Sequence, residues 1–232
     1  MSLSIYDYKD ERLLRPVDNL LGIENAEREI INSSIENAWE RCMYCFSKIN
    51  NAKFNTGGIQ IYHCVQYGMW LYFLGNEIYR RYVDKNNDDA INICDKLFMV
   101  NMSITQMDIY YGHNLPDIFL PAHTTGAIFS PHAKIGNYFM FMQGCNVGLK
   151  GNGFKGNIEA PCIGECVVMF GCSKIIGKCN IGDYVAFGAN SYIKDMDIPS
   201  RSLVFGQYPN VSIVKDKNNM VSTIIQNRFH FG

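Results

Sequence analysis

Two short motifs in the sequence are of a kind that can hold a metal ion or a nucleotide. The first is Cys42-Met43-Tyr44-Cys45, a single C-x-x-C pair. A structural zinc site needs four ligands, usually supplied by two such pairs, and the sequence has no second pair. We therefore expect no metal, and we interpret these cysteines as buried thiols of the core.

The second motif is formed by Gly151, Gly153 and Gly156, which spell G-x-G-x-x-G. This spacing marks a dinucleotide-binding turn only where a strand precedes it and a helix follows it. Six-residue repeats, described below, flank it on both sides. We therefore interpret residues 149–160 as a loop that leaves the repeats, not as a nucleotide site.

Histidines are the side chains best suited to move protons near neutral pH, and the chain has five. Taken alone, His123 would be interpreted as a histidine of the β-domain whose ring is satisfied by backbone. The other four, His63, His113, His132 and His230, are expected to be structural or to lie at the surface.

Bulk composition predicts a packed globular protein. The chain has 232 residues, of which 47% are hydrophobic and 19% charged, with a net charge of −1. This balance provides no field that would attract nucleic acid or an anionic membrane, so we expect neither as a partner. The odd count of nine cysteines and the polar segment Met1–Glu11 lead us to expect reduced thiols and a cytoplasmic location. The longest apolar run, Met69–Leu74, is too short to span a membrane.

The N-terminal part of the chain has helical periodicity. Apolar residues at spacings of three and four predict a helix over 23–50, and a second, aromatic on nearly every side, over about 59–83. All-round apolarity indicates burial between partners, and these partners could be other subunits. A third helix is expected after Asn86-Asn87-Asp88, a candidate N-cap cluster, to about Met107. Residues 1–20 are expected to form an arm.

Beyond residue 110 the helical period gives way to a repeat of six residues. Every sixth residue is apolar, with one change of register across residues 149–160; the positions are Phe129, Ile135, Phe141, Val147, Ile163, Met169, Ile175, Ile181, Phe187 and Ile193. The residue two places earlier is small or compact at all but Phe139, and glycine often follows the apolar position.

This pattern suits a triangular coil with three short strands per turn. One large side chain per face points inward, a small residue fits each crowded corner, and stacked turns bury a continuous core. The alternative is an ordinary antiparallel β-domain, which predicts period-two alternation, and that alternation is weak here.

The repeats, the loop and the helical front end together resemble the serine acetyltransferase branch of the hexapeptide-repeat acyltransferases. The resemblance covers roughly residues 60–211. Its best segment runs from Met107-Asp108-Ile109 to His123-Thr124-Thr125-Gly126, which matches the family's V-D-I-H-P … D-H-x-T-G stretch without a gap. The hexads at 162–167 and 180–185 are general to the superfamily. The resemblance implies an α+β chain: an α-helical N-terminal domain (1–107), a left-handed parallel β-helix with a protruding loop (108–211) and a C-terminal tail (212–232).

The resemblance also implies a site. His123 would be the general base that takes the proton of an acceptor hydroxyl, and Asp108 would orient its ring. Acetyl-CoA, as co-substrate, would lie in a groove between coils against Gly148, Gly171 and Ala189, with Lys194 near its pantetheine or phosphates. The family places its sites between neighbouring coils, so we expect a homotrimer or a dimer of trimers.

Departures from the family pattern concern the acceptor. The family's aspartate before the histidine is Ala122 here, and the Arg-His pair that grips the serine carboxylate is replaced by Glu159-Ala160. The C-terminus also lacks the isoleucine that docks into cysteine synthase, so that complex is not expected. We expect an O-acetyltransferase that acts on a hydroxyl other than that of serine, such as a sugar of a surface polysaccharide or its precursor. The alternatives are a serine O-acetyltransferase and an inactive β-helix scaffold.

Overall fold

The computed structural model describes residues 5–151 and 158–231, and the chain divides into two compact units between Gln106 and Met107. The first unit is helical. It contains α1 (Arg15–Leu21), α2 (Asn25–Lys48), α3 (Cys64–Tyr82) and α4 (Asp88–Thr105), with short 3-10 turns at Glu11–Leu13 and Val83–Lys85. Two short strands, β1 (Ile5–Tyr6) and β2 (Ile59–Gln60), pair antiparallel.

The three predicted helices are confirmed, with one shifted start. Helix α3 begins at Cys64 instead of near residue 59, because Ile59 and Gln60 pair with β1 and the His63 side chain accepts the N–H of Gln66 at the helix start. Asn87 caps α4 by accepting the N–H of Ala90 at 2.9 Å. The capping residues therefore set the helix starts more sharply than the apolar period does.

The expected N-terminal arm is wrong from Ile5 onward. These residues form β1, the 3-10 turn and α1, and the Tyr67 hydroxyl donates to the carbonyl of Leu13 at 2.8 Å. Helix α3 packs against both α2 and α4, and its residues from Gln66 to Asn76 are buried. Its all-round apolarity is therefore accounted for within the chain, without a second subunit.

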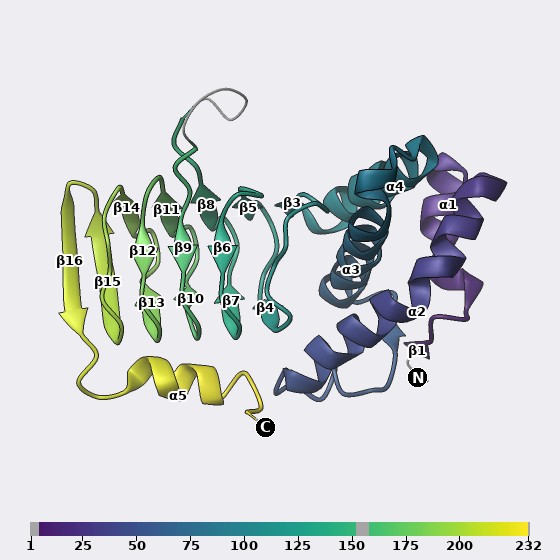
Figure 1. The fold of residues 1–232 in the computed structure, drawn as a ribbon. Coiled ribbons are helices and arrows are strands. Elements are labelled where there is room, and N and C mark those ends of the chain that lie inside the picture. The colour runs from purple at the N-terminus through teal and green to yellow at the C-terminus, as the bar shows by residue number, and fades with distance from the viewer. Residues whose placement is uncertain (1–4, 152–157, 232) are drawn as a thin grey trace. The chain divides into compact units, whose positions relative to one another are not determined.

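The second unit is a parallel β-solenoid of about five turns. Its first sheet stacks β3 (Asp108–Ile109), β5 (Ile128–Phe129), β8 (Asn146–Gly148), β11 (Lys174–Ile176) and β14 (Tyr192–Lys194). The second stacks β6 (Lys134–Ile135), β9 (Cys162–Ile163) and β12 (Asn180–Ile181), and the third stacks β4 (Phe119–Pro121), β7 (Phe139–Phe141), β10 (Val168–Met169), β13 (Val185–Phe187) and β15 (Ser202–Gln207). Figure 1 shows the turns one upon another.

The six-residue register is confirmed by the pairing of the strands. Phe129, Val147, Ile175 and Ile193 stack on one face, and Phe141, Met169 and Phe187 stack on another. All ten predicted apolar positions are buried except Ile135, which is half-buried beside the half-buried Gly136. The ten residues two places earlier are buried as well, so small size at those positions reflects the space at the corners.

The loop predicted over 149–160 leaves the coil between β8 and β9. At its base the Lys150 N–H donates to the Glu159 carbonyl at 2.8 Å, and the Glu159 N–H donates back at 3.1 Å. Gly153 and Gly156 of the G-x-G-x-x-G motif lie outside the described residues. The chain that returns from the loop enters strand β9 and not a helix, which a dinucleotide turn would require.

The C-terminal segment, expected as a tail, folds onto the solenoid. Strand β16 (Asn210–Lys215) pairs antiparallel with β15, and α5 (Met220–Gln226) follows. Figure 1 shows α5 running beneath the coils. Val221, Ile225 and Phe229 are buried, and the Tyr138 ring contacts Phe229 at 5.7 Å and Phe231 at 4.4 Å between centroids.

Candidate active site

His123 lies on an exposed turn between β4 and β5. In the next coil, Met142 stacks on Ala122 and Gly144 on Gly126, with a single residue, Gln143, between them. In the first coil, three residues occupy the same interval: His123, Thr124 and Thr125. The turn that carries His123 is therefore enlarged by two residues, which lifts its imidazole out of the regular coil and into solvent.

We call the column formed by this turn and the turns stacked on it the histidine corner. Its members are residues 122–126, 142–144, 170–172 and 188–190, which superimpose in successive coils. Two predicted cofactor residues belong to it, since Gly171 and Ala189 follow Gln143 in the column. The structure thus brings His123, Gly171 and Ala189 together at one corner.

Asp108 lies on β3. This strand pairs with β5, which follows the histidine corner in the chain. Asp108 pairs with Ile128 of β5, its N–H donates to the carbonyl of Ala127 at 2.8 Å, and its side chain is half-buried. Within the part of the chain that the structure describes, no hydrogen bond joins the Asp108 carboxylate to the His123 ring. Catalytic hydrogen bonds often tighten only when substrate is bound, so the neighbouring placement is the relevant observation.

The other predicted cofactor residues lie at the far ends of the strands of the first sheet, away from the histidine corner. Gly148 of β8 and Lys194 of β14 both pair with Ile176 of β11, and both are half-buried. Gly171 lies in the turn before β11 and Ile176 ends that strand, so the length of β11 separates them. Within one chain, Gly148 and Lys194 therefore form a second group, apart from the histidine corner.

Neither glycine leaves an empty groove, because a neighbouring side chain fills the space above each. A Cβ at Gly148 would lie 2.7 Å from Cδ1 of Ile176, and a Cβ at Gly171 would lie 2.7 Å from Nε2 of Gln143. Both glycines have ordinary negative or extended φ values, so space and not backbone conformation requires them. Gln143 is a residue that sequence reasoning missed; only the stacking of the coils reveals it.

The two residues predicted to meet the acceptor also lie apart. Ala122 is half-buried and precedes His123 at the histidine corner. Glu159 lies at the base of the loop, where its carboxylate is 3.4 Å from Nζ of Lys150. Lys150 also binds Asp195 at 2.9 Å, and this contact raises the pKa of Lys150 and lowers that of Asp195. Glu159 therefore belongs to a cluster of one cation and two carboxylates.

Two of the remaining histidines have structural positions, as predicted. His113 is buried, its Nε2 donates to the Ala133 carbonyl at 3.0 Å, and burial lowers its pKa. His63 caps α3, and partial burial lowers its pKa too. Cys42 and Cys45 are buried thiols, and burial raises the pKa of Cys42 well above its ordinary value.

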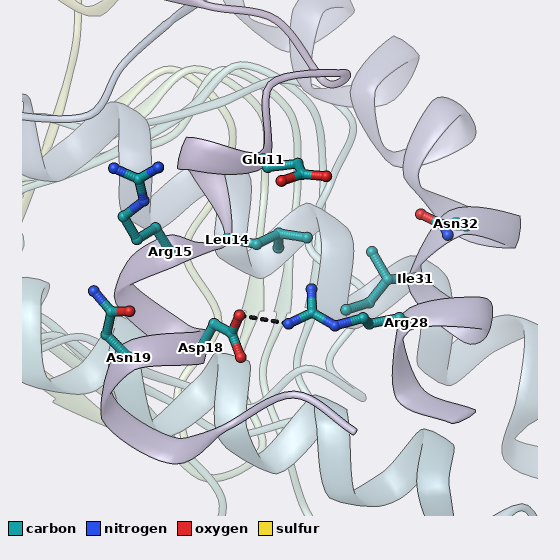
Figure 2. Close-up of a pocket in the computed structure, with 8 residues that line it drawn as sticks. All are labelled: Glu11, Leu14, Arg15, Asp18, Asn19, Arg28, Ile31 and Asn32. Carbon is teal, nitrogen blue, oxygen red and sulfur yellow. Dashed lines mark hydrogen bonds and ion pairs between the residues drawn. The ribbon is translucent and has the colours of Figure 1, made fainter. Parts of the chain in front are cut away.

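A hollow of about 470 Å³ lies in the helical unit, between the N-terminal turns and α2 (Figure 2). Its wall carries two cations and two carboxylates, of which Asp18 and Arg28 form an ion pair; the lining residues are Glu11, Leu14, Arg15, Asp18, Asn19, Arg28, Ile31 and Asn32. None of the predicted site residues lines it.

Over residues 5–151 and 158–231, no group of three or more His, Cys, Asp or Glu side chains is placed to hold a metal ion. In the same residues, no helix combines the length and the apolar character of a membrane span.

Known proteins similar to this chain are serine acetyltransferases. It is 29% identical over 103 residues to the serine acetyltransferase of Synechococcus elongatus, a match that covers 44% of this chain and 41% of the relative. It is 31% identical over 100 residues to serine acetyltransferase 2 of Arabidopsis thaliana, covering 43% and 30%. The chain thus spans less than half the length of these two relatives, and no protein-family model matches it.

The fold is shared with solved serine acetyltransferases. A serine acetyltransferase solved in complex with CoA superimposes with a TM-score of 0.66 at 16% identity, covering 90% of this chain and 86% of that one. The predicted architecture, a helical N-terminal region followed by a parallel β-solenoid, is therefore confirmed. In sequence and fold, the chain is serine acetyltransferase-like.

Proposed function

We propose that this chain is an acetyl-CoA-dependent O-acetyltransferase in which His123 is the general base and Asp108 orients it. The observation that carries the proposal is the exposed imidazole on the enlarged turn of the histidine corner, next to the strand that bears Asp108. It is supported by the likeness to serine acetyltransferases, one of which was solved with CoA. An exposed imidazole flanked by a carboxylate is suited to general-base catalysis.

The proposed reaction is a direct acyl transfer. The acceptor oxygen attacks the carbonyl carbon of the acetyl thioester while its proton passes to the His123 ring. The C–S bond then breaks, and His123 returns that proton to the leaving thiolate. The products are an acetyl ester and the free thiol of CoA, and the transfer consumes no further reactant. Asp108 would hold the other ring nitrogen, which fixes the tautomer and stabilises the imidazolium.

L-serine is the acceptor that the relatives favour, since all the curated relatives found are named serine acetyltransferases. The structure also weakens the argument that the carboxylate of Glu159 would repel the carboxylate of serine. Lys150, whose Nζ lies 3.4 Å from the Glu159 carboxylate, partly offsets that charge and provides a cation at the loop base. We therefore propose serine as the first acceptor to test, ahead of the sugar expected from the sequence.

A sugar hydroxyl remains the second candidate, on one specific observation. The loop-base cluster of Lys150, Glu159 and Asp195 carries a net charge of −1, and Ala122 and Ala160 offer no side-chain hydrogen bond. Carboxylates accept hydrogen bonds from neutral hydroxyl groups, whereas they repel a carboxylate. Such a cluster suits a polyhydroxyl acceptor.

Thiol release from acetyl-CoA decides between these proposals. Purified protein is assayed with L-serine, D-glucose and UDP-glucose as probes, and with His123→Ala as the matched control. We expect His123-dependent release with at least one probe, and the ratio of kcat/KM values identifies the acceptor class. Release no faster than in the His123→Ala variant, with every probe, would favour the inactive scaffold.

A further inference from the structure

We propose that Gln143 is a further catalytic residue, whose side-chain amide donates a hydrogen bond to the oxygen of the acetyl carbonyl as negative charge develops on it. This inference rests on the proposed acetyltransferase function and names a residue that the sequence motifs did not identify. It starts from the register of the coils at the histidine corner.

Gln143 is the neighbour of the enlarged turn in the next coil. The N–H of Ala122 donates to the Phe141 carbonyl at 2.8 Å, and the N–H of Gly144 donates to the Thr125 carbonyl at 2.9 Å. These two bonds bracket the turns on both sides, so Gln143 alone lies opposite His123, Thr124 and Thr125. Adjacent strands of a sheet are about 4.8 Å apart, so Gln143 stands one coil from His123. Acetyl-CoA that lies along this column between Gly171 and His123 would carry its acetyl group past the amide of Gln143.

The amide of Gln143 occupies the space that a side chain at position 171 would fill, and we call this space the seat. Its Nε2 lies 2.7 Å, and its Cδ 3.2 Å, from the point where a Cβ of Gly171 would stand. The side chain therefore folds along the corner column over Gly171, which has no side chain to displace it. The backbone at Gly171 does not need glycine, since its φ is not in the left-handed region. Glycine at position 171 leaves room for this position of the exposed Gln143 side chain, in which its amide can act as a donor.

Gln143 differs from the two residues stacked directly beyond it in the column. Gly171 and Ala189, the next members, carry no side-chain donor. Glutamine is neutral and donates through two N–H bonds, so it can stabilise an oxyanion without competing with His123 for a proton. The loss of one such donor typically lowers kcat by about 100- to 1,000-fold.

The main test is Gln143→Met, which keeps length and packing over Gly171 but removes the donor. We expect kcat for thiol release from acetyl-CoA, measured with the best probe of the acceptor assay, to fall about 100-fold. The KM for acetyl-CoA and the thermal midpoint should stay unchanged, because the amide acts in the transition state. Gln226→Met, a change of an exposed glutamine on α5, is the matched control and should retain wild-type kcat.

A double-mutant cycle tests the seat itself. Gly171→Ala should push the amide aside and lower kcat in the wild-type background. In the Gln143→Ala background the same change should lower kcat by less than it does in the wild type, since the displaced group is gone. Additive losses would overturn the seat, and a Gln143→Met variant within about threefold of wild-type kcat would overturn the role. In both cases His123-dependent turnover by the wild type would leave the proposed function standing, whereas its absence would count against that function first.

Discussion

At the scale of residues, the position of His123 matters as much as its type. A histidine placed on a regular hexad would point into the core or stack within a tight corner. Two additional residues in its turn free it from that register and expose it. Asp108 stands on a strand adjacent to that turn and not in the turn itself, so the proposed pairing of Asp108 with His123 depends on the stacking of the first two coils.

Replacing His123 by alanine tests the proposed base. We expect kcat to fall about 100-fold or more, the usual contribution of a general base, while the KM for acetyl-CoA stays nearly constant. Asp108→Asn should lower the same rate constant by less, because the ring remains in place. Steady-state thiol release measures both, and near-wild-type turnover by His123→Ala would remove the mechanism.

The loop base offers a gain-of-function test of acceptor choice. Glu159→Arg combined with Ala160→His replaces a carboxylate by a cation, which should raise kcat/KM for L-serine about tenfold or more. Opposite charges about 4 Å apart attract by about 4 kcal/mol at an effective dielectric of 20, and solvent screening reduces this gain. Raising the salt concentration should shrink the effect. An unchanged value for serine at low salt would show that the loop base does not face the acceptor.

At the scale of elements, the C-terminal segment completes the solenoid. The outward-facing residues of one sheet are all apolar, and all but Leu203 are buried; they are Leu120, Met140, Val168, Ala186 and Leu203. A sheet buried on both faces needs a covering layer. Helix α5 runs along the coils with Val221 and Ile225 buried (Figure 1), so we infer that it supplies this layer, and its end contacts Tyr138 through Phe229.

Phe229→Ala should therefore destabilise the β-solenoid by about 3 kcal/mol, the lower end for loss of a buried phenylalanine. Phe231→Ala is the comparison, since Phe231 is 47% exposed and only stacks on Tyr138. Its loss should cost about 1 kcal/mol. Denaturant unfolding measures both, and equal losses would mean that α5 is not anchored through Phe229.

At the scale of the whole molecule, the distribution of the predicted site residues favours assembly. His123, Gly171 and Ala189 lie at one corner of the coil, while Gly148, Lys194 and Glu159 lie toward the other end of the sheet. One acceptor and one acetyl group cannot contact both groups in a single chain. A neighbouring copy that brings its loop base to the histidine corner would complete the site.

We accordingly expect a particle of three or six chains. Multi-angle light scattering at micromolar concentration should give about three or six times the chain mass of 26.4 kDa. A monomer with full activity would contradict this prediction.

The architecture could be predicted from the sequence, because hexads and helical periods are local patterns that follow from the polarity and size of each residue. The inward stacks of Phe129, Val147, Ile175 and Ile193 follow directly from that period. It also singled out His123 and Asp108, through a motif aligned without a gap. Which side chains are neighbours across successive coils could be seen only in the folded chain. The seat of Gln143 over Gly171, the ion pair of Glu159 with Lys150 and the covering role of α5 all join residues at least 9 positions apart, and no local pattern encodes which coil stacks on which side chain.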